Sequence, residues 1–402
     1  MGKLRHIVIY FIIFLLLFFY DPLVKIFPNL TSIDEIIGII GFVMIIIILS
    51  RNLLASMLLN YTILLLILIG FIGVVSSYIG GINVTWTNRL IDLFSLYKIQ
   101  FAFLGFLFIP KSAEKEKTLA WLQPIVKIFV SLALIFGLIN LIHDIGMTHD
   151  IRFGMRSFEF IYDNPGTLND RIFCSLGVLY STGGGKKNKF FIFESLFVLF
   201  LTLRANAIGS LIVFVALFLF FGKKKKISLK NMIPVAFLAV LGGWTSINSY
   251  LVQDSTPRAF MLRNGIYLAK KYFPFGSGLG TYGSNIAFKF YSPLYYDFGY
   301  NLIYVLSPVV GTVANDNFWP MMLGQFGIFG TFLFFLMLIL QGNFILKNFE
   351  NKDVKVIAIV IFAYIFMKSM GEAVYTAEFG LMPYMIIAFL FQPNEDIDTE
   401  KD

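Results

Sequence analysis

Apolar segments long enough to cross a bilayer recur along this chain from near its N-terminus to residue 392. They constrain the fold more than any other feature, because about 20 consecutive apolar residues form a helix that spans the hydrocarbon core. Hydrophobic residues make up 58% of the 402-residue sequence and charged residues only 14%, which is unlike a soluble domain. No polar stretch is long enough to fold separately, so we predict a single all-α, polytopic membrane domain over residues 1–402.

The apolar pattern predicts about 12 transmembrane helices. They lie at residues 6–20, 35–50, 55–79, 93–109, 119–142, 168–182, 190–204, 208–222, 232–248, 317–341, 354–370 and 379–392. Short lysine-rich connections at 110–118, 183–189 and 222–231 indicate the cytoplasmic side of the membrane. Both termini are then cytoplasmic. The two longest connections, 142–168 and 248–316, lie on the outer face, where we expect them to form an active-site cap that contains short helices.

The first apolar segment, the cysteine count and the net charge exclude several classes of protein. The first apolar segment begins like a signal peptide, but no small-residue cleavage pattern follows it, so we expect a retained helix. The single Cys174 cannot form an intrachain disulfide, and nothing resembles a Cys/His metal cluster. A net charge of +8 would suggest nucleic acid in a soluble protein, but in a membrane protein its placement matters more. We expect no nucleic-acid partner, no metal and no cofactor.

The arginines are distributed unevenly in this arrangement. Arg5 and Arg51 fall on the predicted inner side, and the others fall on the outer side, against the usual preference of cationic loops for the cytoplasm. The outer arginines are Arg89, Arg152, Arg156, Arg171, Arg204, Arg258 and Arg263. Each could pair with a nearby carboxylate such as Asp150. A planar guanidinium also binds phosphate through two parallel hydrogen bonds, so for the group as a whole the pattern favours an anionic ligand.

Arg204 stands between two apolar runs, in Leu-Thr-Leu-Arg-Ala-Asn-Ala-Ile-Gly. A charge near membrane depth is costly, which makes this residue a functional candidate. Its guanidinium could instead reach the lipid headgroups by snorkelling. Glu194 and Lys368 also lie within predicted spans, and for these we expect a protein partner or a solvated cavity rather than catalysis.

The second outer connection contains a predicted helix at 258–272. Arg263 and Lys270 are seven residues apart and share a face of this helix, with Arg258 to one side. Such a face could hold a diphosphate, or lipid headgroups if the helix is only interfacial.

A glycine-rich turn, Phe-Pro-Phe-Gly-Ser-Gly-Leu-Gly, follows this helix at 273–280. Gly276, Gly278 and Gly280 permit a tight turn with exposed N–H groups. They follow no predicted strand, so they are not a dinucleotide-binding fingerprint.

Asp316, flanked by Asn315 and Asn317, lies where the outer connection enters the predicted span at 317–341. It could cap that helix. It could also act as a general base toward a sugar hydroxyl, because partial desolvation raises the basicity of a carboxylate. The same connection is rich in tyrosine, which could stack on sugar rings or form an interfacial aromatic belt.

Four patches occur in order between about residues 150 and 340, and together they resemble the O-antigen ligase and Wzy polymerase superfamily. Asn164-Pro165 is similar to the family's Asn-Pro-Asn loop, and Leu-Thr-Leu-Arg204 to its Thr-x-Ser-Arg patch. Arg258 and the sequence up to the glycine turn are similar to an arginine, a helix and Pro-x-x-Gly-x-Gly-x-Gly. The stretch that begins at Asp316 is similar to His-Asn followed by Glu-x-Gly-x-x-Gly. The order and spacing are more specific than any one patch.

The chain departs from the family pattern at three positions. Leu203 stands where the family often has serine, and Gln325 where it often has an acid. Asp316 stands where ligases carry a histidine, so a carboxylate replaces an imidazole as the implied base. This last departure favours a polymerase over a ligase.

The resemblance implies a metal-independent glycosyltransferase of GT-C-like architecture, acting on the outer face of a bacterial cytoplasmic membrane. The donor would be a growing glycan on undecaprenyl diphosphate, and the acceptor the non-reducing end of a second lipid-linked repeat unit. Arg204 and Arg258 would stabilise the diphosphate while Asp316 takes the hydroxyl proton. Further implied substrate contacts are Arg263, Lys270, Arg156, Gly278, Gly280 and Asn317. A flippase and a chain-length regulator are implied partners, beside membrane lipids.

Two alternatives remain open at this stage. A flippase or transporter for lipid-linked oligosaccharide would also need arginines that face a diphosphate, but it should show internal repeats and charges along a path through the bilayer. The sequence shows no repeat, and its charges gather on one side. An O-antigen ligase-type transferase or a peptidoglycan-type polymerase would share the architecture and differ in acceptor. The polymerase interpretation requires Arg204 to lie close to Arg258 in space.

Overall fold

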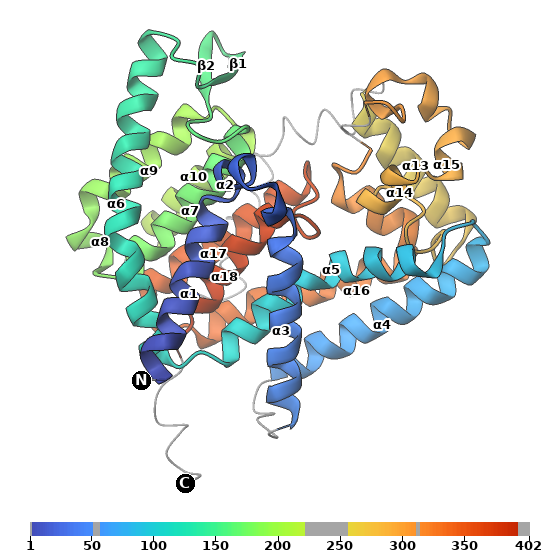
Figure 1. Cartoon of the computed structure of the whole chain (residues 1–402), viewed down its shortest axis with the longest axis horizontal. Coiled ribbons are helices and arrows are strands. Elements are labelled where there is room, and N and C mark those ends of the chain that lie inside the picture. The colour runs from blue at the N-terminus through green and yellow to red at the C-terminus, as the bar shows by residue number, and fades with distance from the viewer. Residues whose placement is uncertain (1, 51–56, 222–255, 311–313, 393–402) are drawn as a thin grey trace.

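The computed structural model is predominantly helical and describes residues 2–50, 57–221, 256–310 and 314–392 (Figure 1). The longer helices are α1 (Gly2–Phe18), α2 (Tyr20–Ile26), α3 (Ile33–Ser50), α4 (Met57–Gly80), α5 (Trp86–Phe108), α6 (Ser112–Ile142), α7 (Pro165–Ser181), α9 (Lys189–Leu201), α10 (Ala205–Phe221), α13 (Pro257–Lys271), α16 (Phe318–Asn348), α17 (Lys352–Ser369) and α18 (Glu378–Leu390). The shorter elements are η1 (Pro28–Ser32), β1 (Thr148–Arg152), β2 (Met155–Phe158), α8 (Gly184–Lys187), α14 (Asn285–Lys289), α15 (Pro293–Asp297), η3 (Tyr300–Leu302) and η4 (Tyr304–Leu306). The predicted spans coincide with helices except 232–248, which lies outside the described residues together with the connection at 222–231.

Within the described residues, five helical segments are long and apolar enough to cross a membrane, namely Pro28–Ser50, α4, α5, α6 and α16. The pair α1 and α2, bent by 81°, makes a sixth if it counts as one span. Large apolar side chains such as Ile67, Phe71 and Phe332 are exposed on these helices, as contact with lipid chains requires. The helices at the other predicted spans are shorter or carry more charge. The fold is therefore helical with membrane-length apolar helices, as the sequence predicts.

α3 and α5 cross at contacts that only glycine allows. A Cβ on Gly38 would lie 2.6 Å from the Cβ of Lys98, and one on Gly105 would lie 2.9 Å from the Cα of Gly41. Small residues of this kind let helix backbones approach closely within a membrane. The close approach also brings Lys98 into an ion pair with Asp34, and both side chains are buried.

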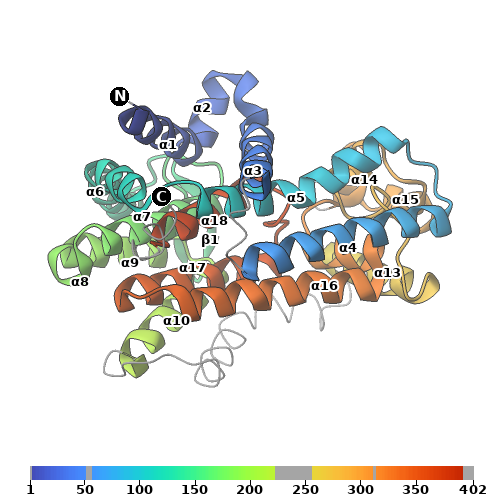
Figure 2. The ribbon, with the colours of Figure 1, turned by 90° about the horizontal axis from the view of Figure 1, so that it is seen from below.

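α16 consists of two helical segments joined at Gly327, whose φ of 65° lies in the left-handed region that favours glycine. The glycine-rich turn after α13 packs into this break. The Ser277 N–H donates to the Gly324 carbonyl oxygen at 2.7 Å, and a Cβ on Gly327 would collide with the carbonyl oxygen of Phe275. We call this contact the α16 joint. α4 packs alongside α16, so the joint is covered within the helical body (Figure 2).

Lys115 is a fully buried cation that ties three helices together. Its Nζ donates to the carbonyl oxygens of Leu107 at 2.8 Å, Ala388 at 3.0 Å and Phe391 at 2.9 Å. These carbonyls belong to the C-terminal ends of α5 and α18, where the last turn of a helix leaves its acceptors without partners inside the helix. The ammonium also faces the negative ends of both helix dipoles. α6 is thereby fastened to the ends of two other helices.

The connection between α6 and α7 contains a β-hairpin, where short helices were expected. β1 and β2 are antiparallel, with Arg152 opposite Met155. The two turn residues Phe153 and Gly154 have φ values of 51° and 75°, and a type I′ hairpin turn requires positive φ at both. The prediction of helices here was wrong because the turn lacks the Asn-Gly or Asp-Gly pair that normally signals a hairpin.

The segment 256–310 contains short helices as predicted, and it has a hydrophobic core of its own. The tyrosines buried in this core are Tyr282, Tyr291, Tyr295 and Tyr300. Their hydroxyls are satisfied inside the protein; for example, Tyr282 Oη lies 2.7 Å from Tyr300 Oη. For Tyr291, Tyr295 and Tyr300 the expectation of sugar stacking or an interfacial belt was wrong, because they build a local core. Tyr296 and Tyr304 are exposed.

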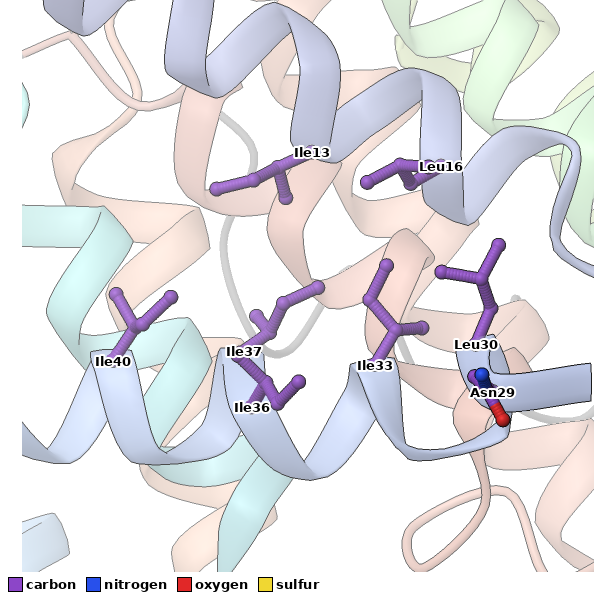
Figure 3. Close-up of a pocket in the computed structure, with 8 residues that line it drawn as sticks. All are labelled: Ile13, Leu16, Asn29, Leu30, Ile33, Ile36, Ile37 and Ile40. Carbon is purple, nitrogen blue, oxygen red and sulfur yellow. The ribbon is translucent and has the colours of Figure 1, made fainter. Parts of the chain in front are cut away.

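An apolar groove of about 260 Å³ lies between α1 and the start of α3 (Figure 3). Ile13 and Leu16 line it from α1, and Ile33, Ile37 and Ile40 line it from α3. The groove carries no charged side chain, so it suits hydrocarbon rather than a polar headgroup.

We expect Lys115→Ala to destabilise the fold strongly, because three buried carbonyl oxygens would lose a charged donor. Each hydrogen bond to a charged group contributes about 1.5–3 kcal/mol, so the thermal midpoint of the detergent-purified protein should fall by several degrees. Lys117→Ala, on the exposed side of the same helix, should leave the midpoint unchanged. Equal midpoints for the two variants would show that Lys115 does not fasten these helices.

Candidate functional site

Five side chains from distant parts of the chain gather near the start of α16. They are Asn164 before α7, Arg204 between α9 and α10, Arg258 in the first turn of α13, Asp316 before α16 and Glu372 between α17 and α18. We call this group the arginine cluster. Arg204 and Arg258 act on one another through their charges, as the polymerase interpretation requires.

An ion pair between Arg258 and Asp316 forms the centre of the cluster. Arg258 Nη2 donates to Asp316 Oδ2 at 2.9 Å, and the two side chains are 40% and 34% exposed, so a ligand can reach both. Asp316 does not cap α16, because Asn317 occupies the N-cap position. The capping role considered for Asp316 was therefore wrong, and its carboxylate engages a guanidinium instead.

Arg204 lies in a tight turn and is partly satisfied. Leu203 before it has a φ of 51°, a left-handed conformation that reverses the chain between α9 and α10. Arg204 Nη2 donates to Asn164 Oδ1 at 2.8 Å, and the same oxygen caps α7 by accepting from the Gly166 N–H at 2.7 Å. Arg204 Nε is buried and has no hydrogen-bond partner among the described residues. A ligand oxygen at this nitrogen would remove the cost of an unpaired donor.

Glu372 joins the cluster to a buried ion pair. Its Oε2 lies 3.3 Å from Lys368 Nζ, and Lys368 Nζ donates to Asp170 Oδ2 at 2.6 Å. The expectation of a protein partner for Lys368 is thus confirmed, as it is for Glu194, which accepts from the Ser131 hydroxyl at 2.7 Å. Sequence reasoning missed Glu372. The available signal was a carboxylate four residues after an in-span lysine, near enough along the chain for the two side chains to pair.

The charges of the cluster act on the acidity of Asp316. Burial raises the pKa of the Asp316 carboxyl above its ordinary value, and Arg258 opposes this through its charge and its hydrogen bond. The negative charge of Glu372 raises the pKa, while Arg204 lowers it by a smaller amount. Arg204 and Arg258 also repel one another. Asp316 and Arg204 therefore each lie within electrostatic range of Arg258 and Glu372. A carboxylate with a raised pKa is a stronger base than an ordinary aspartate.

Arg156, predicted to contact a diphosphate, has structural partners instead. Its Nη1 donates to the Leu141 carbonyl oxygen at 3.2 Å, at the C-terminal end of α6. Neighbouring Arg152 pairs with Asp150 at 2.8 Å, which is the carboxylate pairing considered as the alternative for each arginine. The contact of Arg156 does not place it in the arginine cluster, whereas Arg152 and Asp150 lie within electrostatic range of Arg204.

Two further arginines are buried in the helical body. Arg89 Nη2 donates to the Ile82 carbonyl oxygen at 2.9 Å, and Arg171 Nε donates to the Phe18 carbonyl oxygen at 3.0 Å. Of the outer arginines, Arg204 and Arg258 belong to the arginine cluster, and Arg152 lies within electrostatic range of Arg204.

The helix predicted at 258–272 is confirmed as α13, but its basic residues do not all meet. Lys270 lies about 18 Å from Arg258 along the helix axis, since an α-helix rises about 1.5 Å per residue. Arg263 is rotated by about 140° from Arg258 around the same axis, and its guanidinium lies 5.0 Å from the Phe260 ring. Lys270 and Arg263 are exposed on α13, outside the arginine cluster.

Gly278 and Gly280 are buried, and their N–H groups already donate hydrogen bonds to protein atoms. Gly278 donates to the Gln325 carbonyl oxygen at 3.1 Å, and Gly280 donates to Asp92 Oδ2 at 2.9 Å. The expectation of exposed N–H groups was wrong, because the turn serves the α16 joint rather than an anion. Asn317, also expected to contact substrate, is buried at the start of α16.

The arginine cluster combines two guanidiniums with a carboxylate that is accessible and basic. Two guanidiniums can bind the oxygens of a phosphate-type anion, and an adjacent carboxylate can accept a proton. Such an arrangement suits transfer of a group away from an anionic leaving group. Across the part of the chain that the structure describes, no three His, Cys, Asp or Glu side chains converge as a metal site.

Comparisons with known proteins do not place the chain in a family. No family model, curated protein or solved structure matches it. Its function is therefore inferred from the arginine cluster and from the sequence pattern.

Inorganic pyrophosphate should bind the purified full-length protein through Arg204 and Arg258. Replacing either residue by glutamine removes charge-assisted hydrogen bonds of about 1.5–3 kcal/mol, so the dissociation constant should rise by about tenfold or more. Isothermal titration calorimetry in detergent measures this change.

Arg156→Gln and Lys270→Gln are the matched controls, because both remove one positive charge outside the arginine cluster. They should leave the affinity for pyrophosphate unchanged. An equal loss in all four variants would mean that pyrophosphate binds by general charge attraction.

Proposed function

We propose that this chain is a membrane-embedded polysaccharide polymerase of the O-antigen ligase and Wzy polymerase superfamily. It would transfer a growing glycan from undecaprenyl diphosphate to the non-reducing end of a lipid-linked repeat unit. The observation that carries the proposal is the contact between Arg258 and Asp316 within electrostatic range of Arg204. Cations suited to a leaving diphosphate and a base suited to a hydroxyl lie side by side there.

In the proposed reaction, the acceptor hydroxyl oxygen attacks the anomeric carbon of the donor sugar. The bond between that carbon and the diphosphate oxygen breaks, and the diphosphate leaves with the bonding electron pair. Arg204 and Arg258 stabilise the departing oxygens, so no general acid is required. Asp316 accepts the hydroxyl proton. When Arg258 moves from the carboxylate to the diphosphate, Asp316 loses a neighbouring positive charge and becomes a stronger base.

The proposal places the arginine cluster on the outer face of a bacterial cytoplasmic membrane, in a GT-C-like fold with about 12 spans. The membrane-length apolar helices and the lysine-rich connections support this setting. A flippase would supply the lipid-linked repeat units, and a chain-length regulator would limit the product.

Two related functions fit the structure less well. An O-antigen ligase-type transferase would use the same cluster, but Asp316 stands where those enzymes carry a histidine. A flippase would need charges available along a path through the bilayer. The buried cations Lys98, Lys115 and Lys368 are instead each held by protein partners.

Arg204→Ala, Arg258→Ala and Asp316→Ala should each leave the protein in the membrane and stop chain growth. Loss of a charge that acts in the transition state lowers the rate by about 10²-fold or more. The assay incubates purified protein with lipid-linked repeat units without added metal and resolves the glycans on a gel. Arg258→Lys should also be poor, because an ammonium cannot make bidentate contacts.

Arg156→Ala and Lys270→Ala serve as controls and should retain polymer ladders. Normal ladders from all three cluster variants would refute the assignment of the site. Near-wild-type activity of Arg258→Lys would show that charge alone is sufficient at that position.

The rate of chain growth should fall as the pH decreases through the pKa of Asp316, because the base must be ionised. That pKa lies above the ordinary aspartate value, and the negative charge of Glu372 contributes to raising it. Glu372→Gln should therefore shift the acid limb of the rate profile to lower pH. Glu116→Gln, an exposed carboxylate on α6, is the control and should not shift it. A shift to higher pH in Glu372→Gln would contradict Asp316 as the base.

A further inference from the structure

A polar cavity of about 360 Å³ adjoins the arginine cluster. It lies between the N-terminal end of α3, the middle of α5, the start of α14 and the connection between α17 and α18. Asp316 forms part of its wall, so a molecule in the cavity would lie against the proposed base. Small-molecule sites in proteins have volumes of roughly 300–1,000 Å³, and this cavity has the size for a short saccharide.

The wall of the cavity is strongly acidic. Its charged residues are Asp34, Glu35, Asp92, Asp316, Glu378 and Lys98. Lys98 pairs with Asp34 and lies 3.2 Å from Glu35 Oε1, which leaves one ammonium shared between two carboxylates. The rest of the polar wall consists of hydroxyl and amide groups. Asp316 is paired with Arg258, which does not line the cavity, so the other carboxylates carry most of the negative charge.

One carboxylate oxygen of this acidic wall receives no N–H or hydroxyl hydrogen bond from the described part of the protein. Glu35 Oε2 is buried and accepts no hydrogen bond from an N–H or hydroxyl donor among the described residues, and the Glu35 carboxyl lies against that of Asp34. Buried acceptors without partners cost free energy, and a ligand that brings donors removes that cost. The carboxylates do not converge as a metal site in the described part of the chain, so a single cation does not explain them.

Sugar hydroxyls are suitable donors for such a wall, because an ionised carboxylate only accepts hydrogen bonds. A protonated amine on a sugar would fit equally well. A carboxylate or phosphate on the sugar would face several like charges in a partly desolvated space, which is unfavourable. The wall therefore discriminates saccharides by their charge.

We propose that this cavity is the acceptor subsite and that it selects terminal sugars that are neutral or carry an amine over sugars that carry a carboxylate or phosphate. The assignment rests on the proposed function, because the acceptor hydroxyl must lie against Asp316. It adds the chemical class of the acceptor, which follows from Glu35, Glu378 and their neighbours.

The test measures binding of simple glycosides to the purified full-length protein by saturation-transfer NMR with competition. The probes are methyl glycosides of glucose and galactose, of glucosamine and galactosamine, and of glucuronic and galacturonic acid. At least one neutral or amine-bearing glycoside should bind, and the matching uronic acid should bind at least about tenfold more weakly. Absence of binding by every probe, or equal binding of the uronic acid, overturns the assignment.

Glu35→Gln and Glu378→Gln locate the selectivity. Both substitutions should narrow the difference in binding affinity between the neutral sugar and the uronic acid, while Glu116→Gln on α6 should leave that difference unchanged. Thermal midpoints equal to wild type confirm that the variants are folded, and if one fails this check the other carries the test. Unchanged selectivity in a folded variant refutes the role of the acidic wall.

Failure of this inference can be told apart from failure of the proposed function. Selective binding without chain growth would refute the polymerase and leave the saccharide site in place. Chain growth that uses acceptors ending in a uronic acid as readily as neutral ones would refute only the charge selection.

Discussion

Burial of charge in an apolar interior is the constraint on which the rest of this structure depends. A charge removed from water costs several kcal/mol unless protein groups replace the lost solvation. Lys368 and Asp170 are each 1% exposed and lie 2.6 Å apart, Lys98 pairs with Asp34, and Lys115 is enclosed by carbonyl oxygens. Each of these contacts joins helices that are distant in sequence. Because buried charges require protein partners, these contacts help to fix how the helices are arranged.

The requirement that buried charges have protein partners is met least completely in the arginine cluster. Arg204 keeps a buried nitrogen without a partner, and the Arg258–Asp316 pair is about one-third exposed. Glu372 connects the cluster to the rigid interior, because it lies 3.3 Å from Lys368 while its charge acts on Asp316. A site that is held by buried ion pairs on one side and open to a polar cavity on the other is suited to bind a charged ligand without rearranging the helices.

The sequence predicts the helices well, because apolar length and periodicity are local properties. It also predicts α13 and the proximity of Arg204 to Arg258. It does not predict which partner a side chain chooses, since that depends on segments far away in the chain. Of the glycine N–H groups expected to bind phosphate, that of Gly278 donates within the α16 joint and that of Gly280 donates to Asp92. Arg156 contacts the end of α6, and Glu372 lies at the site although no sequence motif indicated it. The hairpin was missed because Phe-Gly is an unusual pair for a type I′ turn.

The α16 joint limits how chains with this fold can diverge. A side chain at Gly276 would meet the backbone of Gln325, and one at Gly327 would meet the backbone of Phe275. Neither position can change unless the opposite backbone moves with it. We therefore expect the two glycine runs, in the turn at 273–280 and in α16 around Gly327, to be conserved or lost together. A distant relative that has lost all other similarity should still carry both runs, at a similar separation along the chain. Their joint occurrence is therefore a better search pattern than either run alone.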